Sequence, residues 1–262
     1  MANNFAGDPN CKSLWRFESG ALTVDSSGNG NTLTAYHAAS EDLVNFKEGA
    51  CAADFEIDTS DGYYRADADL CSGYPLKYGE SNLAFTICSW SKVESIAHSH
   101  HADIFTKTYD TTGLESMRLA WWRWNDEYRM TFVHGFDNSY QSIEMFILTA
   151  AECVGVWNHF GFTYNDATKA WTCRRWNDSA SEASSANGVA TNNIQVTTSR
   201  IGVGCHHWGN EINATDSFDG MLDEIVVFNR VLSVPEIDKI RQQTYTYRPH
   251  DLRLVKKAEL PT

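Results

Sequence analysis

Oxygen-bearing side chains gather in one glycine-rich stretch, Asp25-Ser-Ser-Gly-Asn-Gly-Asn31, where they could bind a metal ion. Calcium takes about six to eight oxygen ligands from carboxylates, amides and backbone carbonyls on a flexible loop. The stretch supplies the Asp25 carboxylate, the amides of Asn29 and Asn31, and two glycines that free their carbonyls. The same residue types also form Asx turns, in which the side chain bonds the nearby backbone. The sequence leaves both interpretations open.

Two groups of histidines could bind a transition metal, His98-Ser-His100-His101 and His206-His207. Such a metal needs three or four ligands held in a fixed geometry. Neither group has the i, i+4 spacing of a helix or the pairing of two strands that would fix this geometry. Both groups are therefore predicted to be solvated histidines in loops.

A tryptophan-rich segment, Trp121-Trp-Arg-Trp124, has the composition of a β-strand. Strand alternation places Trp122 and Trp124 on one face and Trp121 on the other. One face must enter the core, and the other could stack on sugar rings or on a partner protein, because Trp is favoured in both roles. An aromatic-rich core is the alternative. Together with a predicted loop farther along the chain, this face gives the candidate ligand-binding residues Trp122, Trp124, Trp208, His206 and His207.

Charge and composition exclude several classes of protein. The 262 residues include 34 acidic and 21 basic side chains, a formal net charge of −13. Nucleic-acid and anionic-membrane binding depend on clustered Lys and Arg, so neither partner is predicted. A hydrophobic content of 42% is that of an ordinary globular protein and is inconsistent with wholesale disorder.

The seven cysteines are an odd number, are widely dispersed and contain no CxxC pair. Neither a zinc site nor a compact disulfide framework is typical of that pattern, which predicts reduced thiols. The first residues show no basic and apolar segments of a signal peptide, and no window approaches the ~18 apolar residues of a membrane span. We therefore expect synthesis in the cytoplasm, with release outside the cell by another route such as lysis.

The elements that must position these residues are short strands. Period-2 alternation of apolar side chains recurs along most of the chain, with turn signals about every ten residues. This pattern is typical of an all-β sandwich or barrel. Strands are predicted over 13–18, 31–36, 51–56, 62–67, 83–92, 103–108, 115–123, 128–133, 142–147, 159–164, 170–176, 194–203 and 219–229.

One helix is predicted near the end of the chain. Ser233-Val-Pro-Glu236 is a capping box with Pro235 in the first turn, and apolar residues follow at helical spacing. A short C-terminal helix over about 234–243 therefore closes one domain, residues 1–243. Residues 244–262 form a basic tail without periodicity.

Six motifs occur in a fixed order. They are Leu14-Trp-Arg-Phe-Glu18; Asp25-Ser-Ser-Gly-Asn-Gly-Asn31; Cys51-Ala-Ala-Asp-Phe-Glu with Asp61-Gly-Tyr-Tyr; Leu83-Ala-Phe-Thr-Ile-Cys-Ser-Trp90; Trp157-Asn-His-Phe-Gly-Phe-Thr-Tyr164; and Phe218-Asp-Gly-Met-Leu-Asp-Glu-Ile-Val-Val-Phe-Asn-Arg-Val-Leu-Ser233. In this order the chain resembles the laminin-G-like, concanavalin A-like lectin/glucanase jelly rolls. The resemblance spans residues 14–240 and implies a two-sheet antiparallel jelly-roll sandwich. It implies little chemistry, since this fold serves lectins, glycosidases, lyases and adhesion modules.

The resemblance also implies a metal. Members of this family often hold one structural Ca²⁺ between the glycine-rich turn and the Asp of the last strand. Carried over to this chain, the predicted ligands are Asp25, Asn29, Asn31 and Asp223, with Glu18 as a further candidate. Such an ion would pin the first strand to the last.

Catalysis is not predicted. Glycosidases of this fold carry E-x-D-x-x-E on a strand, and Glu56-Ile-Asp58-Thr-Ser-Asp61 imitates that motif. However, Asp61-Gly62 is a turn dipeptide, so these acids should lie in water at a sheet edge. The chain also has no G-x-S-x-G elbow, phosphate loop or dinucleotide fingerprint.

These observations favour a non-enzymatic structural or adhesion module. Stand-alone domains of this kind resemble virion proteins of tailed bacteriophages, as capsid decorations or tail and fibre components. Its partners would be other virion proteins or further copies of itself, with glycans or a cell surface at its loops, and the basic stretch 248–257 as a docking segment. The alternative is a free-standing carbohydrate-binding lectin module. A glycoside hydrolase or polysaccharide lyase is the weakest hypothesis.

Overall fold

Seventeen strands and two short α-helices form the regular structure of the part described by the computed structural model. That part comprises residues 3–5, 7–81, 83–97, 100–108, 115–137, 139–208, 211–213 and 216–247. The elements are β1 (Cys11–Trp15), β2 (Thr34–His37), β3 (Ser40–Asp42), β4 (Ala52–Phe55), β5 (Gly62–Arg65), β6 (Ala84–Val93), β7 (His101–Lys107), β8 (Met117–Trp124), β9 (Glu127–Phe136), β10 (Ser139–Leu148), α1 (Ala150–Cys153), β11 (Trp157–Asn165), β12 (Ala170–Asn177), β13 (Glu182–Val189), β14 (Ile201–Val203), β15 (His206–Trp208), β16 (Glu211–Asn213), β17 (Gly220–Phe228) and α2 (Val234–Arg241).

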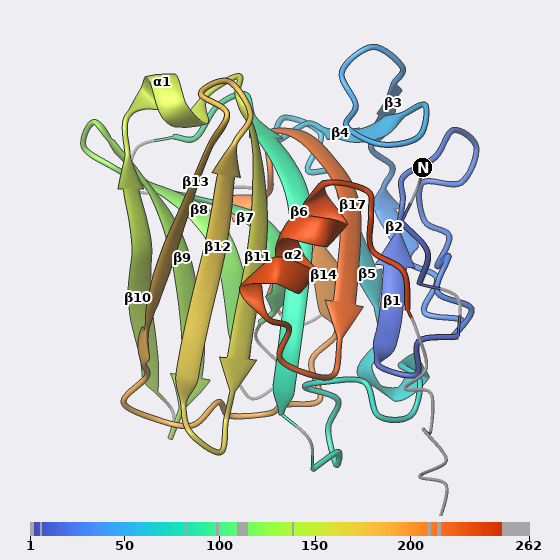
Figure 1. Ribbon diagram of the computed structural model, residues 1–262, viewed down its shortest axis with the longest axis vertical. Coiled ribbons are helices and arrows are strands. Elements are labelled where there is room, and N and C mark those ends of the chain that lie inside the picture. Colours follow the sequence, from blue (N-terminus) through green and yellow to red (C-terminus); the bar gives the residue numbers. More distant parts are fainter. Residues whose placement is uncertain are drawn as a thin grey trace, which may run out of the picture.

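The strands form two antiparallel sheets packed face to face (Figure 1). One sheet has the order β13-β12-β11-β6-β17-β4-β3, with β1 also paired to β17. The other has the order β10-β9-β8-β7-β14-β5-β2, and β15 pairs with β16 in a separate hairpin. The predicted all-β, two-sheet jelly-roll sandwich is confirmed.

The space between the sheets is filled by large apolar side chains from alternate strand positions. On β8, Met117, Leu119 and Trp121 are fully buried, and the Trp121 ring meets Phe160 of the opposite sheet edge-on at 5.2 Å. Successive strand residues point to opposite faces, so the residues between them must face outward. The predicted separation of Trp121 from Trp122 is thereby confirmed.

Helix α2 covers the outer face of the larger sheet (Figure 1). The predicted capping box is present, because Ser233 and Glu236 bond each other's backbone as predicted for this N-terminus. Ile237 packs directly over Gly161, where any Cβ would collide with it. A second apolar cluster beneath the helix comprises Phe5, Cys11, Leu14, Cys88, Val226, Phe228, Leu232, Ile237, Ile240 and Tyr245.

The start of the predicted tail belongs to this cluster. Tyr245 is buried, stacks on Phe5 at 5.0 Å, and its hydroxyl donates to Asp8. Residues 244–247 therefore pack as part of the domain. The rest of the predicted tail, 248–262, lies outside the described residues.

Some elements differ from the sequence prediction. Strand β13 was not predicted, because its exposed Ser, Ala and Asn residues show no apolar alternation; it is an edge strand paired with β12. The strand predicted over 194–203 is confined to Ile201–Val203.

All seven cysteines are free thiols, and six of them are buried. In the part of the chain that the structure describes, no helix has the length and apolar character needed to cross a bilayer.

Candidate functional site

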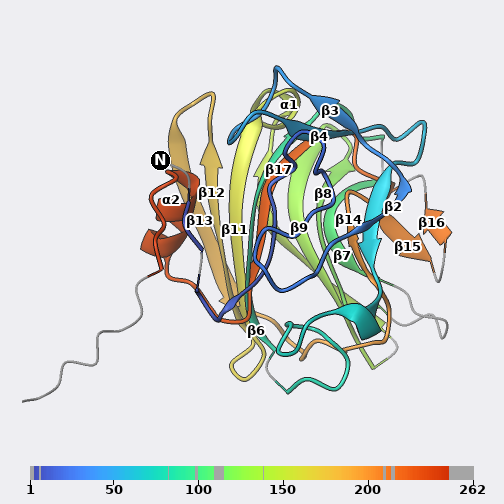
Figure 2. The ribbon, with the colours of Figure 1, turned by 90° about the vertical axis from the view of Figure 1, so that its right-hand side faces the viewer.

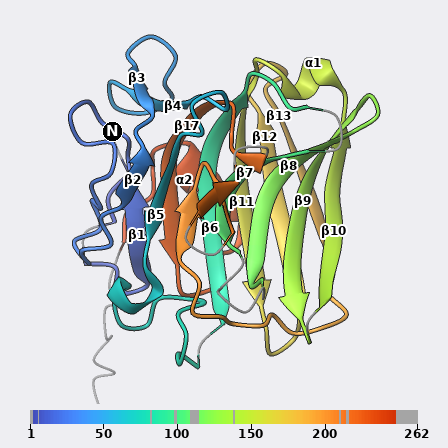
Figure 3. The same cartoon turned by 180° about the vertical axis from the view of Figure 1, so that it is seen from behind.

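A groove of about 400 Å³ lies on the outer face of the seven-stranded sheet, opposite to α2. Figure 2 shows α2 and the β15–β16 hairpin on opposite sides of the sandwich, and Figure 3 shows the hairpin lying in front of the strands of the seven-stranded sheet. The groove is lined by His101, Glu115, Arg118, Trp122, Val133, Tyr140, Ser142 and Glu144.

The indole of Trp122 lies at the centre of an aromatic strip across three strands. His101 on β7 and Arg129 on β9 are its direct cross-strand partners. The His101 ring stacks at 5.7 Å and 14°, and the Arg129 guanidinium lies over the indole at 5.2 Å. Trp124, 41% exposed, extends the strip, with its ring 5.6 Å from Trp122. The structure thus places both predicted Trp residues on an open face, and Trp122 lines the groove.

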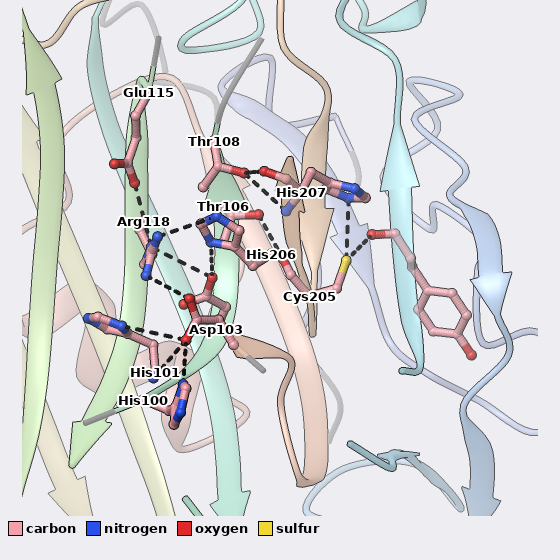
Figure 4. A network of polar contacts seen from close by, with 12 residues as sticks. His100, His101, Asp103, Thr106, Thr108, Glu115, Arg118, Cys205, His206 and His207 are labelled. Atoms are coloured by element: carbon pink, nitrogen blue, oxygen red, sulfur yellow. Dashed lines mark hydrogen bonds and ion pairs between the residues drawn. The ribbon is translucent and has the colours of Figure 1, made fainter. Parts of the chain in front are cut away.

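Arg118, which lines the groove with Trp122, lies at the centre of a buried group of charges. Figure 4 shows Glu115, Asp103 and His206 around it. The Nε of Arg118 lies 3.5 Å from Glu115 Oε1 and 3.7 Å from Asp103 Oδ2, and its Nη1 lies 3.6 Å from Asp216 Oδ2. Asp103 is fully buried, and Arg118 and Glu115 are each 7% exposed. One guanidinium is therefore surrounded by three carboxylates. Strand alternation places Arg118 on the same face as Trp122. The sequence alone could therefore have predicted that Arg118 lies beside Trp122.

The hairpin supplies His206 to this group. Its Nδ1 lies 3.0 Å from Asp103 Oδ2, and its Nε2 lies 3.5 Å from Arg118 Nη2. His207 faces elsewhere: its Nε2 lies 3.3 Å from Cys205 Sγ, and its backbone N–H donates to Thr108. His206 thus contacts the charges at the groove, but neither His206 nor His207 is among the residues that line it.

The prediction that these histidines are solvated in loops is wrong for three of them. His101 lies on β7, and His206 and His207 lie on β15 and are at most 1% exposed. The reason is that the hairpin folds back on the sheet, where polar partners replace water. Their sequence neighbours show no apolar alternation, so no local pattern indicated burial. Trp208 ends β15, and its side chain, like His98, lies outside the described residues.

Burial also sets the charges near the groove. It lowers the pKa of His101 to about 4, assisted by the positive charge of Arg118, so this ring is neutral at pH 7. Burial raises the pKa of the Glu115 carboxyl. For Asp216, burial acts to raise the pKa of the carboxyl, but Arg118 and the backbone N–H of His101, among other contributions, together hold that pKa below its ordinary value. The network can therefore hold fixed acceptors and donors for hydroxyl groups.

The predicted metal ligands do not converge on one point. Trp15 pairs with Ile225 of β17 on one edge of β1 and with Asp25 on the other, so Asp25 and the last strand lie on opposite sides of β1. Asp25 accepts backbone N–H groups from Leu14, Ser27 and Asn31, and the Asn29 amide donates to the carbonyl of Cys11. An ion bound by Asp25 would have to replace these hydrogen bonds.

Asp223 and Glu18 meet at the loop before β4. One oxygen of Asp223 accepts the backbone N–H groups of Lys47 and Glu48, at 2.8 and 3.0 Å. Its other oxygen is buried and has no hydrogen-bond partner among the described residues. Glu18 accepts the N–H of Ala50 in the same loop. Burial raises the pKa of Asp223 to about 8. A buried carboxylate oxygen without a partner, on a residue that shares a loop contact with a second carboxylate, fits the ligand chemistry of a hard cation.

Two of the three acids that imitate a glycosidase motif are exposed, as the turn dipeptide predicted. The prediction is wrong for Asp61, which is buried and accepts the backbone N–H of Glu56 and the hydroxyl of Thr59. Glu56 and Asp58 are exposed in the turn between β4 and β5. The carboxylates of Asp54, Glu56 and Glu94 lie within 4.8 Å of one another at this edge. None of these residues lines the groove.

Comparison with known proteins identifies the superfamily to which the fold belongs. Residues 76–238 match the family model described as the concanavalin A-like lectin/glucanases superfamily. A search of the curated proteins found no match.

Three solved structures show a similar fold at low identity. The tailspike protein 2 enzymatically active domain of bacteriophage CBA120 is 12% identical, with a TM-score of 0.57, over 82% of this chain and 30% of that one. The binding domain of botulinum neurotoxin serotype C1 is 12% identical, with a TM-score of 0.58, over 89% and 52%. The sialidase of Trypanosoma rangeli is 13% identical, with a TM-score of 0.51, over 90% and 33%. The chain thus spans from less than a third to about half of each of these proteins.

Proposed function

The chain belongs to the concanavalin A-like lectin/glucanase superfamily, and from that premise we propose that it is a carbohydrate-binding module whose ligand lies in the groove over Trp122. The observation that carries the proposal is the half-buried Trp122 indole in the groove, flanked by hydrogen-bonding side chains. Indole faces stack on the apolar faces of sugar rings, and fixed polar groups orient the hydroxyls. The groove volume falls in the usual range for small-ligand sites.

Several groups are placed to bind hydroxyls. Glu115 and Glu144 offer acceptors, while Tyr140, 66% exposed, and Ser142 offer hydroxyls along β10. The structurally similar sialidase of Trypanosoma rangeli bears on the proposal because it has been solved in complex with an inhibitor and with sialic acid. Those ligands are properties of that larger protein.

The test is a glycan array followed by titration of the bound sugars. Replacing Trp122 with Ala should weaken binding about 10- to 100-fold, the effect of removing a central aromatic contact. Tyr78→Ala is the matched control, since Tyr78 is 60% exposed and lies outside the groove. Equal affinity of the Trp122 variant and the native chain would refute the groove as the site.

We propose binding without catalysis. A glycosidase needs two carboxyl groups about 5–10 Å apart that act on the sugar directly. In the groove Glu115 is held by Arg118 and Glu144 by Arg129. Release of reducing sugar from any glycan that binds, lost in Glu115→Gln and in Glu144→Gln, would overturn this part of the proposal.

Display on a bacteriophage virion is a second, finer proposal, which the likeness to a phage tailspike domain favours. On this proposal the chain is a decoration, tail or fibre component, assembles with other virion proteins or further copies, and reaches the exterior on lysis. Mass spectrometry of purified particles should then detect it in many copies per particle. Removal of 248–262 tests the docking role of the tail, because residues 244–247 belong to the packed domain. Unchanged assembly would refute that role.

We also propose a structural calcium ion at Asp223 and Glu18. Its support is the buried, unpartnered oxygen of Asp223. At calcium concentrations 100-fold above Kd the ion should stabilise the fold by about 2.7 kcal/mol, a rise in Tm of several degrees. Asp223→Asn should abolish the rise, whereas Asp25→Asn should retain it. Calcium-independent melting of the native chain, or loss of the rise only in the Asp25 variant, would contradict this placement.

A further inference from the structure

We infer that the groove selects uncharged sugars and discriminates against anionic ones such as sialic acids, uronic acids and sulfated sugars. The inference rests on the proposed function and names the class of ligand for the same site. What carries it is the arrangement of charge: both arginines at the groove are already enclosed by carboxylates of the protein itself.

Arg118 is the cation on the groove floor. Glu115, Asp103 and Asp216 surround its guanidinium at 3.5–3.7 Å, and His206 lies on a fourth side. Recognition of a carboxylate or sulfate by Arg depends on two parallel N–H donors directed at the incoming oxygens. An anionic ligand would have to displace a buried protein carboxylate, which would then be left unpaired at high cost.

Arg129 is the cation beside the Trp122 ring. Glu127 and Glu144 each lie 2.5 Å from its guanidinium nitrogens, on either side. The group therefore holds the indole in place and already has two anionic partners. An anionic sugar stacked on Trp122 would meet the carboxylate of Glu144, which lines the groove.

His101, the histidine that lines the groove, does not change this balance. His101 stacks on Trp122, but burial and Arg118 lower its pKa to about 4, so it is uncharged at pH 7. His100 lies with its Nδ1 3.5 Å from Asp216 Oδ1, again beside a carboxylate. Among the described residues at the groove, five carboxylates face two guanidinium groups: Asp103, Glu115, Glu127, Glu144 and Asp216 against Arg118 and Arg129.

Uncharged sugars have no such conflict. A hydroxyl both donates and accepts, so it can donate to a carboxylate oxygen that remains paired with its arginine. The carboxylates that repel an anion are therefore the acceptors that bind a neutral ring. The charge excess and the aromatic platform together favour a neutral hexose unit.

The experiment compares matched pairs of sugars that differ by one negative charge. The native chain is titrated with array hits and with lactose against 3′-sialyllactose, at low and at high salt. The neutral member should bind at least 10-fold more tightly in 20 mM salt, and the ratio should shrink in 0.5 M salt because ions screen the repulsion.

Glu127→Gln is the informative variant. Glu127 does not line the groove, and its replacement leaves Arg129 with one carboxylate instead of two. The neutral-to-anionic ratio should fall at least threefold. Asp238→Asn is the matched control, because it removes the partner of Arg174 on the opposite sheet and should leave the ratio unchanged.

The outcomes separate this inference from the proposed function. Anionic members that bind as tightly as neutral ones, with binding still lost in Trp122→Ala, would overturn the selectivity while the carbohydrate-binding function stands. An unchanged ratio in Glu127→Gln would also count against it. An array without any bound glycan would overturn the proposed function, and the inference would fall with it.

Discussion

The outer faces of the two sheets are built from strands with the same alternation of side chains, yet one face is covered by a helix and the other is open. On the larger sheet, Gly161 and Cys88 lie under α2, and Ile237 fills the space above them. On the seven-stranded sheet, Arg118 and Trp122 occupy equivalent outward positions and line an open groove. The face under α2 is closed around the apolar cluster that contains Ile237, whereas the open face combines exposed aromatic rings with a buried network of charges.

The difference shows how side-chain size and charge determine which outer face stays open. A helix can approach a sheet closely only where the outward residues are small, and Gly161 provides that clearance. Charged residues on the other face need polar partners as they become buried, and the β15–β16 hairpin contributes His206 as a partner of Asp103. The covered face therefore depends on packing, and the open face depends on electrostatic balance.

The largest effect is expected from breaking that balance at Arg118. Arg118→Ala leaves Asp103, Glu115 and Asp216 without their cation, so the free energy of unfolding should fall by about 3–5 kcal/mol. Arg129→Ala is the control: its ion pairs are shorter, at 2.5 Å, but lie at the surface, so the loss should be about 1 kcal/mol or less. Urea unfolding of both variants measures the difference. Equal losses would show that the floor of the groove is not a charge-dependent part of the fold.

The next effect tests packing on the covered face. Ile237→Ala removes a fully buried side chain between α2 and the sheet, so stability should fall by about 2–4 kcal/mol. Affinity for any sugar bound in the groove should remain within about twofold, because α2 lies on the other side of the sandwich (Figure 2). Val231→Ala, at a 41% exposed position, should change stability by about 0.5 kcal/mol or less. A loss of sugar affinity in the Ile237 variant would mean that the two faces are coupled.

The fold was largely predictable because its signals are local. Alternation correctly separated Trp121 from Trp122 and Trp124, and the capping box at Ser233 correctly marked the start of α2. Such patterns depend only on residues a few positions apart. Strand β13 escaped prediction because an exposed edge strand of small polar residues has no apolar pattern to detect.

The site was predictable only in part because its chemistry is long-range. Trp122 followed from strand alternation, and Arg118 could have followed from the same rule. The hydrogen-bond contact of His206 with Asp103 joins residues 103 positions apart, and it forms only because the hairpin folds back over β7. No spacing in the sequence encodes that contact. The same limit explains why the five predicted metal ligands, chosen by resemblance, divide between the two sides of β1.

The smallest expected effect is the loss of stability at acid pH, and it again contrasts the two faces. His159 is buried on the covered face against Trp90, with its pKa lowered to about 3 by burial and by Arg241. The unfolded chain takes up a proton near pH 6.5, whereas the folded chain does not. The stability contributed by this neutral histidine is therefore complete above about pH 6.5 and is lost as the pH falls toward 3.

His159→Phe isolates this contribution because it retains a ring against Trp90 and removes the titrating group. Between pH 7.5 and pH 5.0 the native chain should lose about 2 kcal/mol more of its free energy of unfolding than the variant does. His37→Phe, at an exposed position, should keep the native difference within about 0.5 kcal/mol. If the native chain and the His159 variant lost stability in parallel, water would have to reach His159, and the covered face would be as open to solvent as the groove.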